Sequence, residues 1–193
     1  MRRAYAQYRL IFDHSLNGIL LNEPAKGTIL AANPEACRLL GRPEAELLGL
    51  DRSDVMDQTD PHLALAVEER ARTGKFRGEV TFLRADGTPL PAEVTSSIFK
   101  DADGKDMTVV FFADISERKA AEAALRASET QYRLLFDNSL VGAIVSDPAT
   151  GEFLAVNPEA CRMLGYAEAE LRTLGRSALI DIKDPCGGGH HLA

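Results

Sequence analysis

The chain has 193 residues, of which 45% are hydrophobic and 26% charged, and a formal net charge of −7, a balance typical of a folded globular protein. Its basic residues are dispersed among acidic ones, which argues against nucleic-acid binding. No apolar run approaches the roughly 20 residues that a membrane-spanning helix needs. Three cysteines do not form the framework of a disulfide-rich secreted domain, so we expect a cytoplasmic protein.

Patterning along the first 116 residues predicts a domain of helices and strands. Apolar spacing and helix caps place helices at 3–13, 34–40, 43–49 and 62–72. Alternation and turn residues place strands at 18–22, 28–32, 76–83, 90–99 and 107–115. The acidic stretch from Asp51 to Asp60 is expected to be an irregular, solvated loop. This order predicts an α+β fold, in which a five-stranded antiparallel sheet carries short helices on one face.

The sequence repeats itself at a constant offset of 124 residues. Residues 8–47 recur as residues 132–171 with 25 of 40 positions identical and no gap. The similarity ends near Pro185, and residues 186–193 match nothing in the first copy. The chain therefore divides into an N-terminal helix (1–16), a complete module (17–116), a helical linker (117–136) and a partial second module (137–193).

The linker between the copies is predicted to be a helix over residues 116–136, which contain no glycine or proline. A seam with the four- and three-residue spacing of a coiled coil runs along it, formed by Ala121, Leu125, Ser128, Tyr132 and Leu135. A coiled coil of only two heptads, with alanine and serine at seam positions, has marginal stability. Two interpretations stay open: a dimeric coiled coil, or a helix that lies on its own domain.

The partial second module lacks the three later strands that cover the hydrophobic residues of the first. We expect residues 137–193 to be partly disordered, or to be completed by strand exchange with another chain. The hydrophobic residues left without cover are Leu140, Ile144, Leu154, Met163 and Leu164.

A set of short motifs follows in order along the first module. They are Tyr8-Arg-Leu-Ile-Phe-Asp13, Gly18-Ile-Leu-Leu-Asn22, Asn33-Pro-Glu-Ala-Cys-Arg-Leu-Leu-Gly41, Glu46-Leu-Leu-Gly49, Arg84-Ala-Asp-Gly87 and Asp114-Ile-Ser-Glu-Arg-Lys119. In this order and spacing, the chain resembles the PAS sensor-domain family. Residues 5–119 match a whole domain of that family, and residues 129–185 match the first half of a second one.

The resemblance implies a sheet curved around a small-molecule pocket, and a signal that leaves through the junction after the last strand. By likeness to family members with known pockets, and by alternation, the inward-facing positions are Leu20, Asn22, Gly78, Val80, Phe82, Ala92, Val94, Ser96, Val110 and Phe112. These mostly apolar positions fit a ligand pocket or a filled core. The signal relay is expected at Asp114, Ile115 and Glu117, with Asp114 ending the strand and capping the helix.

Flavin is the first candidate cofactor that the resemblance implies. Flavin-binding members of the family use amide side chains on the last three strands, and the matching positions here are Phe82, Ala92 and Phe112, which cannot hydrogen-bond through their side chains. Their reactive cysteine would fall near Arg52, whereas Cys37 lies on an earlier helix. We therefore do not expect flavin.

Haem and metal ions are the other candidates. Haem-binding members use a histidine on the helix at 62–72, where His62 is a weak candidate about one residue out of register. A tail with Cys186, His190 and His191 contains metal-ligand types but no helix to fix them. We expect no metal site, and no cofactor is required.

Two functions fit the sequence, and a third, enzyme activity, has no residues in its favour. The first is a sensory module that responds to a small apolar or amphipathic ligand, or to a protein partner. It would relay the response to an output domain, such as a histidine kinase or diguanylate cyclase, in a longer protein. The alternative is a ligand-free module for dimerisation and protein interaction. No motif of a nucleophilic hydrolase, P-loop enzyme or metalloprotease is present, so no enzyme activity is expected.

For either function we expect a homodimer. Val109 and Phe111 alternate onto the outer face of the sheet, where an apolar strip needs a cover. That cover is either the entry helix of the same module or the same surface of another chain. The residues predicted at the interface are Tyr8, Ile11, Val109, Phe111, Leu125 and Tyr132.

Overall fold

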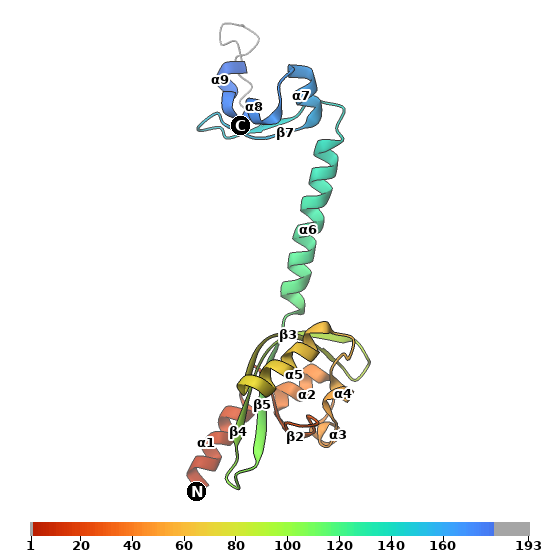
Figure 1. Ribbon diagram of the computed structural model, residues 1–193, viewed down its shortest axis with the longest axis vertical. Coiled ribbons are helices and arrows are strands. Elements are labelled where there is room, and N and C mark those ends of the chain that lie inside the picture. Colours follow the sequence, from red (N-terminus) through yellow and green to blue (C-terminus); the bar gives the residue numbers. More distant parts are fainter. Residues whose placement is uncertain (1, 180–193) are drawn as a thin grey trace. The chain divides into compact units, whose positions relative to one another are not determined.

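The computed structural model describes residues 2–179, and the side chains of all of these except residues 2–6, 8, 177 and 178. The chain divides after Ala121 into two compact units, each described here by itself. Figure 1 labels their helices and strands.

The first unit is built on a five-stranded antiparallel sheet. Its strands are β1 (Gly18–Asn22), β2 (Ile29–Ala32), β3 (Lys75–Leu83), β4 (Pro89–Lys100) and β5 (Asp106–Asp114). They lie in the order β2-β1-β5-β4-β3, so the last strand of the sequence occupies the centre of the sheet. This arrangement confirms the predicted α+β fold and pairs the first strand, β1, with the last, β5.

Helices α2 to α5 cover one face of this sheet (Figure 1). The helices of the first unit are α1 (Arg2–Asp13), α2 (Pro34–Leu40), α3 (Glu44–Leu47), α4 (Arg52–Val55) and α5 (Pro61–Thr73). Helix α5 packs on β3, and α2 packs on β1. The caps of α2 are those that the sequence predicts, with Asn33 at its start and Gly41 in the left-handed region at its end.

The acidic stretch is not the irregular, solvated loop that we expected, because its carboxylates cap helices. Helix α4 lies within it, and the backbone N–H of Asp51 donates to the Asp54 carboxylate at 2.8 Å. The buried carboxylate of Asp60 accepts hydrogen bonds from the backbone N–H groups of His62 at 2.9 Å and Thr81 at 2.7 Å. Free N–H groups at helix starts need such partners, so the carboxylates of Asp54 and Asp60 have structural roles.

The core lies between the inner face of the sheet and the helical layer. The rings of Phe82 and Phe112 stack there with their centroids 4.5 Å apart. A side chain at Gly18 would collide with the Phe112 ring, so this strand position requires glycine. Leu40 of α2 and Leu90 of β4 are fully buried in the same cluster. Most of the interior of the first unit is therefore filled with side chains.

One buried asparagine joins α1 to the sheet and to α2. The Oδ1 atom of Asn33 accepts from the backbone N–H groups of Ile19 and Ala36, each at 2.8 Å. Its Nδ2 group donates to the carbonyls of Phe12 and Asn17, each at 3.0 Å. All four hydrogen bonds of the side chain are used, so the end of α1 is fixed to the start of β1.

The second unit repeats the first half of this architecture. Its elements are β6 (Ile144–Ser146), β7 (Phe153–Val156), α7 (Pro158–Leu164), α8 (Glu168–Leu174) and α9 (Arg176–Leu179), with β6 and β7 antiparallel. These residues form defined elements, while partial disorder of the second module stays a prediction. The hydrophobic residues predicted to lack cover are indeed exposed, among them Leu140 at 91%. Strand exchange stays a prediction.

The predicted linker helix is confirmed as α6 (Ser116–Asp137). Leu125, Tyr132 and Leu135 on its seam are each more than half exposed. The rings of Tyr132 and Phe136 stack with centroids 5.5 Å apart. A coiled coil along this seam stays a prediction.

Candidate functional site

Four of the ten positions predicted to face inward line a small cavity in the first unit: Val80, Val94, Ser96 and Val110. All ten predicted positions are buried except Gly78, which is half-buried: Leu20, Asn22, Val80, Phe82, Ala92, Val94, Ser96, Val110 and Phe112. Alternation therefore placed these side chains correctly, while their role in ligand binding stays a prediction. The cavity beside them measures about 20 Å³, which is room for roughly one water molecule.

This cavity lies between the sheet and the helices α4 and α5. The sheet contributes Phe76, Val80, Val94, Ser96 and Val110. The helical side contributes Arg52, Met56, Leu63, Ala66, Val67 and Arg70. Two cationic side chains that we did not predict as site residues thus lie at a cavity that is otherwise lined by apolar side chains and Ser96.

Arg70 occupies a position on α5 that normally carries an apolar residue. It lies seven residues after Leu63 and four after Ala66, on the face that packs against the core. Its guanidinium is half-buried and has no hydrogen bond or ion pair with residues 2–179. Burial and the charge of Arg52 lower the pKa of Arg70 to about 10, so it remains a cation at neutral pH. Its helical spacing was the signal in the sequence that could have identified it.

Arg52 approaches the same cavity from the start of α4. Its Nη2 group donates to the carbonyl of Pro24 at 3.3 Å. Burial lowers its pKa, although the nearby charge of Asp51 acts in the opposite direction. The carboxylate of Asp51 accepts a hydrogen bond from the Thr28 hydroxyl, and no ion pair with Arg52 is formed within the described range 2–179.

Two buried polar atoms at the neighbouring end of the sheet have no partner in the described part of the chain. Asn22 and Thr108 lie opposite each other on β1 and β5. The Nδ2 group of Asn22 donates to the carbonyl of Gly27 at 3.0 Å, but Asn22 Oδ1 and Thr108 Oγ1 are both unsatisfied. Thr108 is two residues from Val110 on the same strand face, next to the cavity. Unsatisfied buried polar atoms are uncommon, so this end of the core has unused hydrogen-bonding capacity.

The junction after the sheet is fixed by Asp114. Its Oδ1 atom caps α6 by accepting from the backbone N–H of Ser116 at 2.8 Å, and its Oδ2 atom accepts from Arg84 at 3.1 Å. Arg84 also donates to the carbonyl of Leu39, at the end of α2, at 2.7 Å. Burial acts to raise the pKa of Asp114, but the bonds from Ser116 and Arg84 outweigh it and lower the pKa. The end of β5, the start of α6 and the end of α2 are therefore connected through one carboxylate.

The first turn of α6 is held to the sheet at a second point. The Glu79 carboxylate of β3 pairs with Arg118 at 2.8 Å and with Lys119 at 2.6 Å. Ile115 is buried, and its backbone N–H donates to β4 at 3.0 Å. Glu117, which we predicted for the relay, is exposed on the same turn. The sequence placed Asp114 and Ile115 at this junction, and their role in a relay stays a prediction. Glu79 was not predicted, because it lies 39 residues from Arg118 along the chain.

The structure does not place His62 in the core cavity. Its side chain is 67% exposed at the start of α5, with Nδ1 at 3.0 Å from Asp60 Oδ1. This position removes the geometric basis for His62 as a haem ligand. Across residues 2–179, no three His, Cys, Asp or Glu side chains are grouped closely enough to hold a metal ion. The tail residues Cys186, His190 and His191 lie outside the described residues.

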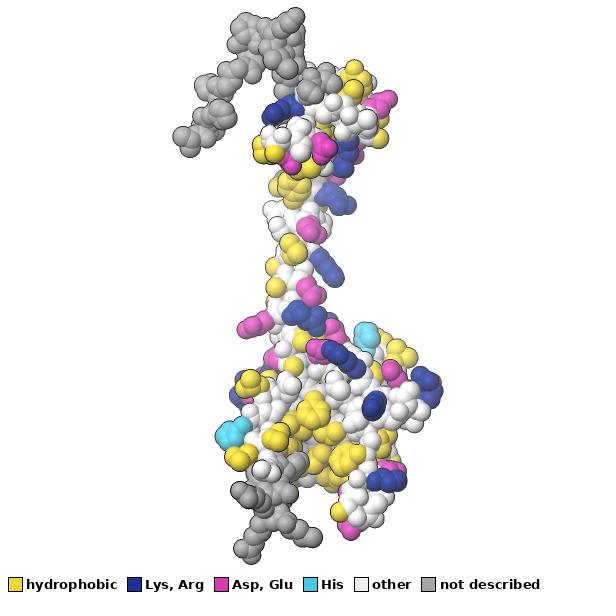
Figure 2. All heavy atoms as spheres, turned by 90° about the vertical axis from the view of Figure 1, so that its left-hand side faces the viewer, with side chains coloured by type: hydrophobic (Ala, Val, Ile, Leu, Met, Phe, Trp, Pro, Cys, Tyr) yellow, Lys and Arg dark blue, Asp and Glu magenta, His cyan; other side chains and the backbone are white. Residues whose placement is uncertain are grey.

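The outer face of the sheet carries an apolar groove of about 430 Å³. Its lining is Ile11, Phe12, Ile19, Leu21, Phe99, Asp101, Met107, Val109 and Phe111. Figure 2 shows hydrophobic side chains gathered on this side of the first unit. Ile11 is 74% exposed and Phe111 is 39% exposed, so three of the predicted interface residues meet at one groove. The side chain of Tyr8 lies outside the described part.

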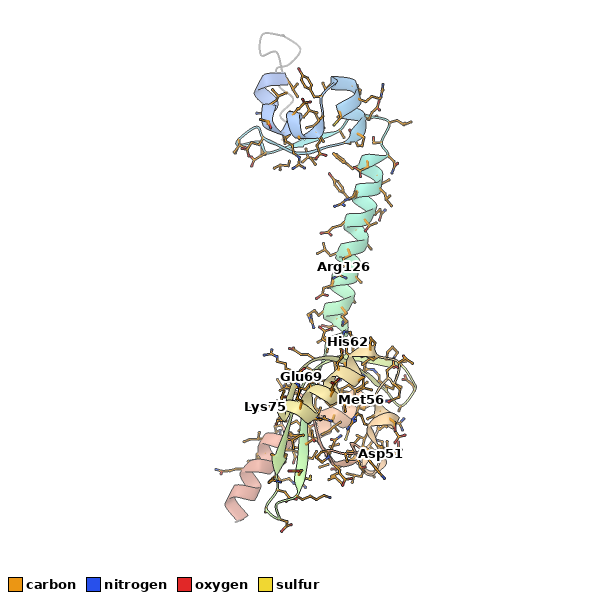
Figure 3. The ribbon with its side chains drawn as sticks, in the orientation of Figure 1. Asp51, Met56, His62, Glu69, Lys75 and Arg126 are labelled. Atoms are coloured by element: carbon orange, nitrogen blue, oxygen red, sulfur yellow. The ribbon has the colours of Figure 1, made fainter. Side chains whose placement is uncertain are left out.

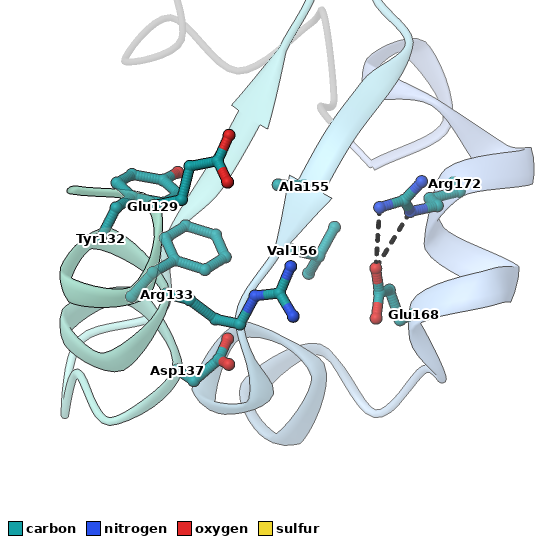
Figure 4. A pocket seen from close by; sticks show the side chains of 9 residues that line it. Glu129, Tyr132, Arg133, Asp137, Ala155, Val156, Glu168 and Arg172 are labelled. Atoms are coloured by element: carbon teal, nitrogen blue, oxygen red, sulfur yellow. Dashed lines mark hydrogen bonds and ion pairs between the residues drawn. The ribbon is translucent and has the colours of Figure 1, made fainter. Parts of the chain in front are cut away.

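The second unit contains a wide hollow of about 600 Å³ beside the end of α6 (Figure 4). Tyr132, Arg133 and Glu129 line it from α6, and Val156 lines it from β7. Its one ion pair drawn in Figure 4 joins Glu168 and Arg172 of α8 at 3.0 Å. This hollow is not the counterpart of the core cavity, which is lined by α4, α5 and the strands β3 to β5.

The fold, the cavity and the helical junction define a PAS-type sensory domain. The family model for the PAS domain matches residues 16–117, and a second PAS domain model matches residues 130–190. The chain belongs to the PAS domain family.

Curated relatives place similar sequences in signalling proteins. Sporulation kinase E of Bacillus subtilis is 26% identical over 178 residues, which cover 91% of this chain and 23% of the relative. An uncharacterized signaling protein of Caulobacter vibrioides is 31% identical over 168 residues, covering 80% of this chain and 19% of the relative. The chain thus spans less than a quarter of the length of either relative.

Solved structures show the same fold. A PAS domain of an HTR-like protein from Haloarcula marismortui superposes with a TM-score of 0.50 and 24% identity, covering 59% of this chain and 93% of that one. A light-oxygen-voltage domain studied with a flavin analogue superposes with a TM-score of 0.51 and 17% identity, covering 68% of this chain and 99% of that one. Among the described helices, none is both long and apolar enough to cross a membrane.

Proposed function

We propose that this chain is the sensory segment of a longer, cytoplasmic signalling protein. The first PAS domain responds to a small molecule or protein partner, and α6 transmits the response towards an output domain. A histidine kinase is the favoured output, since one curated relative is named as a kinase, with a diguanylate cyclase as the alternative. The segment itself performs no catalysis.

The hydrogen bonds that Asp114 makes to Ser116 and Arg84, at the junction of β5 and α6, are the observation that carries this proposal. Strand β5 places Val110 and Phe112 in the core and ends at Asp114, which caps α6. A shift of β5 caused by a change in the core would alter the bonds of Asp114 to Ser116 and Arg84. The start of α6 would then act as a two-state element that the core biases.

A cofactor is not needed for this function. A light-oxygen-voltage domain shares the fold, but Phe82, Ala92 and Phe112 offer no side-chain hydrogen bonds to a flavin. The cavity of about 20 Å³ is also far smaller than the roughly 300 Å³ of a typical ligand pocket. An absorption spectrum of the purified chain with flavin or haem bands would contradict this part of the proposal.

Hydrogen exchange of the full chain tests the relay. We expect Asp114→Ala to speed the exchange of residues 116–121 about 3- to 30-fold, because a helix cap is lost, with the strands unchanged. Asp106→Ala, at the other end of β5, is the matched control. If Asp114→Ala unfolds the sheet, Asp114 has only a structural role.

A second variant distinguishes a role of Asp114 in signal transmission from a role only as the cap of α6. Val110→Ala changes the cavity wall without touching α6. In a relay, Val110→Ala alters the exchange at the start of α6 when Asp114 is present, and has no such effect in the Asp114→Ala background. Equal effects in both backgrounds would reject the relay.

A ligand-free dimerisation module is the second candidate, favoured by the apolar groove at Ile11, Val109 and Phe111. Homodimers would cover this groove, with Leu125 and Tyr132 of α6 contributing a coiled coil. Native mass spectrometry of the purified chain distinguishes the two candidates, since a bare dimer without a bound mass supports the interaction module. Phe111→Glu should then give monomers, with Glu93→Gln as an exposed control on the neighbouring strand.

A further inference from the structure

We propose that the cavity between α4 and α5 binds a small carboxylate, with its oxyanion between the guanidinium groups of Arg52 and Arg70 and a short apolar tail inside. The inference rests on the sensory function proposed above and gives its ligand a chemical class. It narrows the small apolar or amphipathic ligand that the sequence suggested to a small anion with an apolar tail.

The first argument is the unmatched charge. Arg70 stands on the core-facing side of α5, half-buried, with no carboxylate partner in the described part of the chain. Burial of a charge without a partner is destabilising. The charge of Asp51 acts on Arg52, but the Asp51 carboxylate accepts a hydrogen bond from Thr28 and forms no ion pair with Arg52 in the described part of the chain. An anionic ligand would supply the charge that the two arginines lack.

The second argument is that Arg52 is held in place before any ligand arrives. Gly27, in the turn between β1 and β2, has a positive φ of 79°, and a Cβ there would lie 2.8 Å from the Cβ of Arg52. The second unit repeats this arrangement, with Arg176 at the equivalent position 3.7 Å from a Cβ placed on Gly151. A prepositioned guanidinium lowers the ordering cost of binding, and its recurrence makes Arg52 part of the module.

The third argument is the size and lining of the space. A cavity of about 20 Å³ holds roughly one water-sized group, so it fits the methyl group of acetate, while the longer tail of propionate has to displace lining side chains. Met56, Leu63 and Val110 line it with apolar surface, and the buried Ser96 hydroxyl lines it from β4. Guanidinium groups bind carboxylates through paired N–H donors. A charged head with a short tail therefore matches this site better than a long apolar molecule.

The proposed site can be located in Figure 3 by two labelled residues. Met56 lies directly after α4, and Glu69 directly precedes Arg70 on α5. The test uses the full chain, with sodium acetate, propionate and butyrate as probes and sodium chloride and sulfate at equal ionic strength as comparison salts. Chemical shifts of the arginine Nε–H groups, assigned with Arg52→Met and Arg70→Met, report binding. We expect saturable shifts of both signals with acetate and propionate.

The variants give effects of opposite sign on binding and stability. Arg70→Met should weaken carboxylate binding about 10- to 100-fold, because bonds to a charged group are lost. The same change should raise the thermal unfolding midpoint of the ligand-free first unit, because an unpaired charge leaves the core face. Arg72→Met, exposed on the same helix, should change neither.

Other outcomes would overturn the inference. Carboxylate effects no larger than those of chloride, or unchanged affinity in Arg70→Met, would reject the site. Sulfate binding as tight as that of propionate would reject the apolar tail and point to an inorganic oxyanion. Carboxylate binding without any change at α6 would support the site and count against the sensory function. Absent binding with an intact Asp114 relay would reject only the site.

Discussion

The two copies of the module share local structure but differ in burial. Helices α2 and α7 both begin at an asparagine cap, continue with proline and end at a glycine in the left-handed region. Asn157 makes the same four hydrogen bonds as Asn33, and it links Phe136 at the end of α6 to the second unit. Leu40 is nevertheless fully buried, while its equivalent Leu164 is 40% exposed.

This difference shows which elements of the module are needed to form the candidate site. The capped helices form in both copies, because their caps and turns are local. The cavity wall needs α5 and the strands β3 to β5, which have no counterpart among residues 122–179. Arg176 therefore repeats the position of Arg52 without the second cation, Arg70. A complete sensory site requires the later strands as well as the repeated half.

The largest expected effect is a difference in unfolding free energy between two equivalent variants, Leu40→Ala and Leu164→Ala. Leu40→Ala should cost the first unit about 2–5 kcal/mol of unfolding free energy, because a fully buried side chain leaves a void. Leu164→Ala should cost the second unit only about 0.5 kcal/mol, as at most surface sites. Urea unfolding followed by hydrogen exchange of peptides from each unit measures both. Equal losses would show that Leu164 is buried in solution, as strand exchange or dimerisation predicts.

A smaller effect concerns pH and only the first unit. Burial acts to raise the pKa of Asp60, but hydrogen bonds from His62 and Thr81 outweigh it and lower the pKa. A lowered pKa contributes stability above the unfolded value of about 3.9, and this stability is lost as the pH falls through the folded value.

Asp60→Asn keeps a capping residue but removes the charge. It should therefore destabilise the first unit by about 1 kcal/mol at pH 7, with the difference shrinking below about pH 4. Thermal unfolding at several pH values measures this, and Asp103→Asn in an exposed turn is the control. A difference that persists unchanged at pH 2 would mean that charge is not its origin.

The smallest effect should be equal in the two copies. Glu35 pairs with Arg38, and Glu159 pairs with Arg162, both on exposed helix surfaces. Glu35→Gln and Glu159→Gln should each destabilise their helix slightly at low salt, and less in 1 M salt because of screening. Local hydrogen exchange of α2 and α7 measures both. Unequal costs would show that burial elsewhere affects even this exposed pair.

Most elements of the fold were predictable, because their signals are local. Alternation along β3 to β5 identified the inner face, and Asn33 with Pro34 identified the start of α2. Helix α4 was missed because its four residues are too few to show a period. The Asp114 junction was found from its motif, but its partner Arg84 lies 30 residues away along the chain, and spacing alone does not pair them.

The sequence by itself determined the repeat, the strands and helices of the first module and the direction of its core side chains. These depend on periodicity, caps and turns within a few residues. Only the tertiary structure decided that Arg52 and Arg70 meet at one cavity and that His62 lies outside it. It also decided that Asn22 Oδ1 and Thr108 Oγ1 have no hydrogen-bond partner among the described residues. Those facts depend on how distant segments pack, because the pairing of β5 between β1 and β4 brings residues far apart in the chain together.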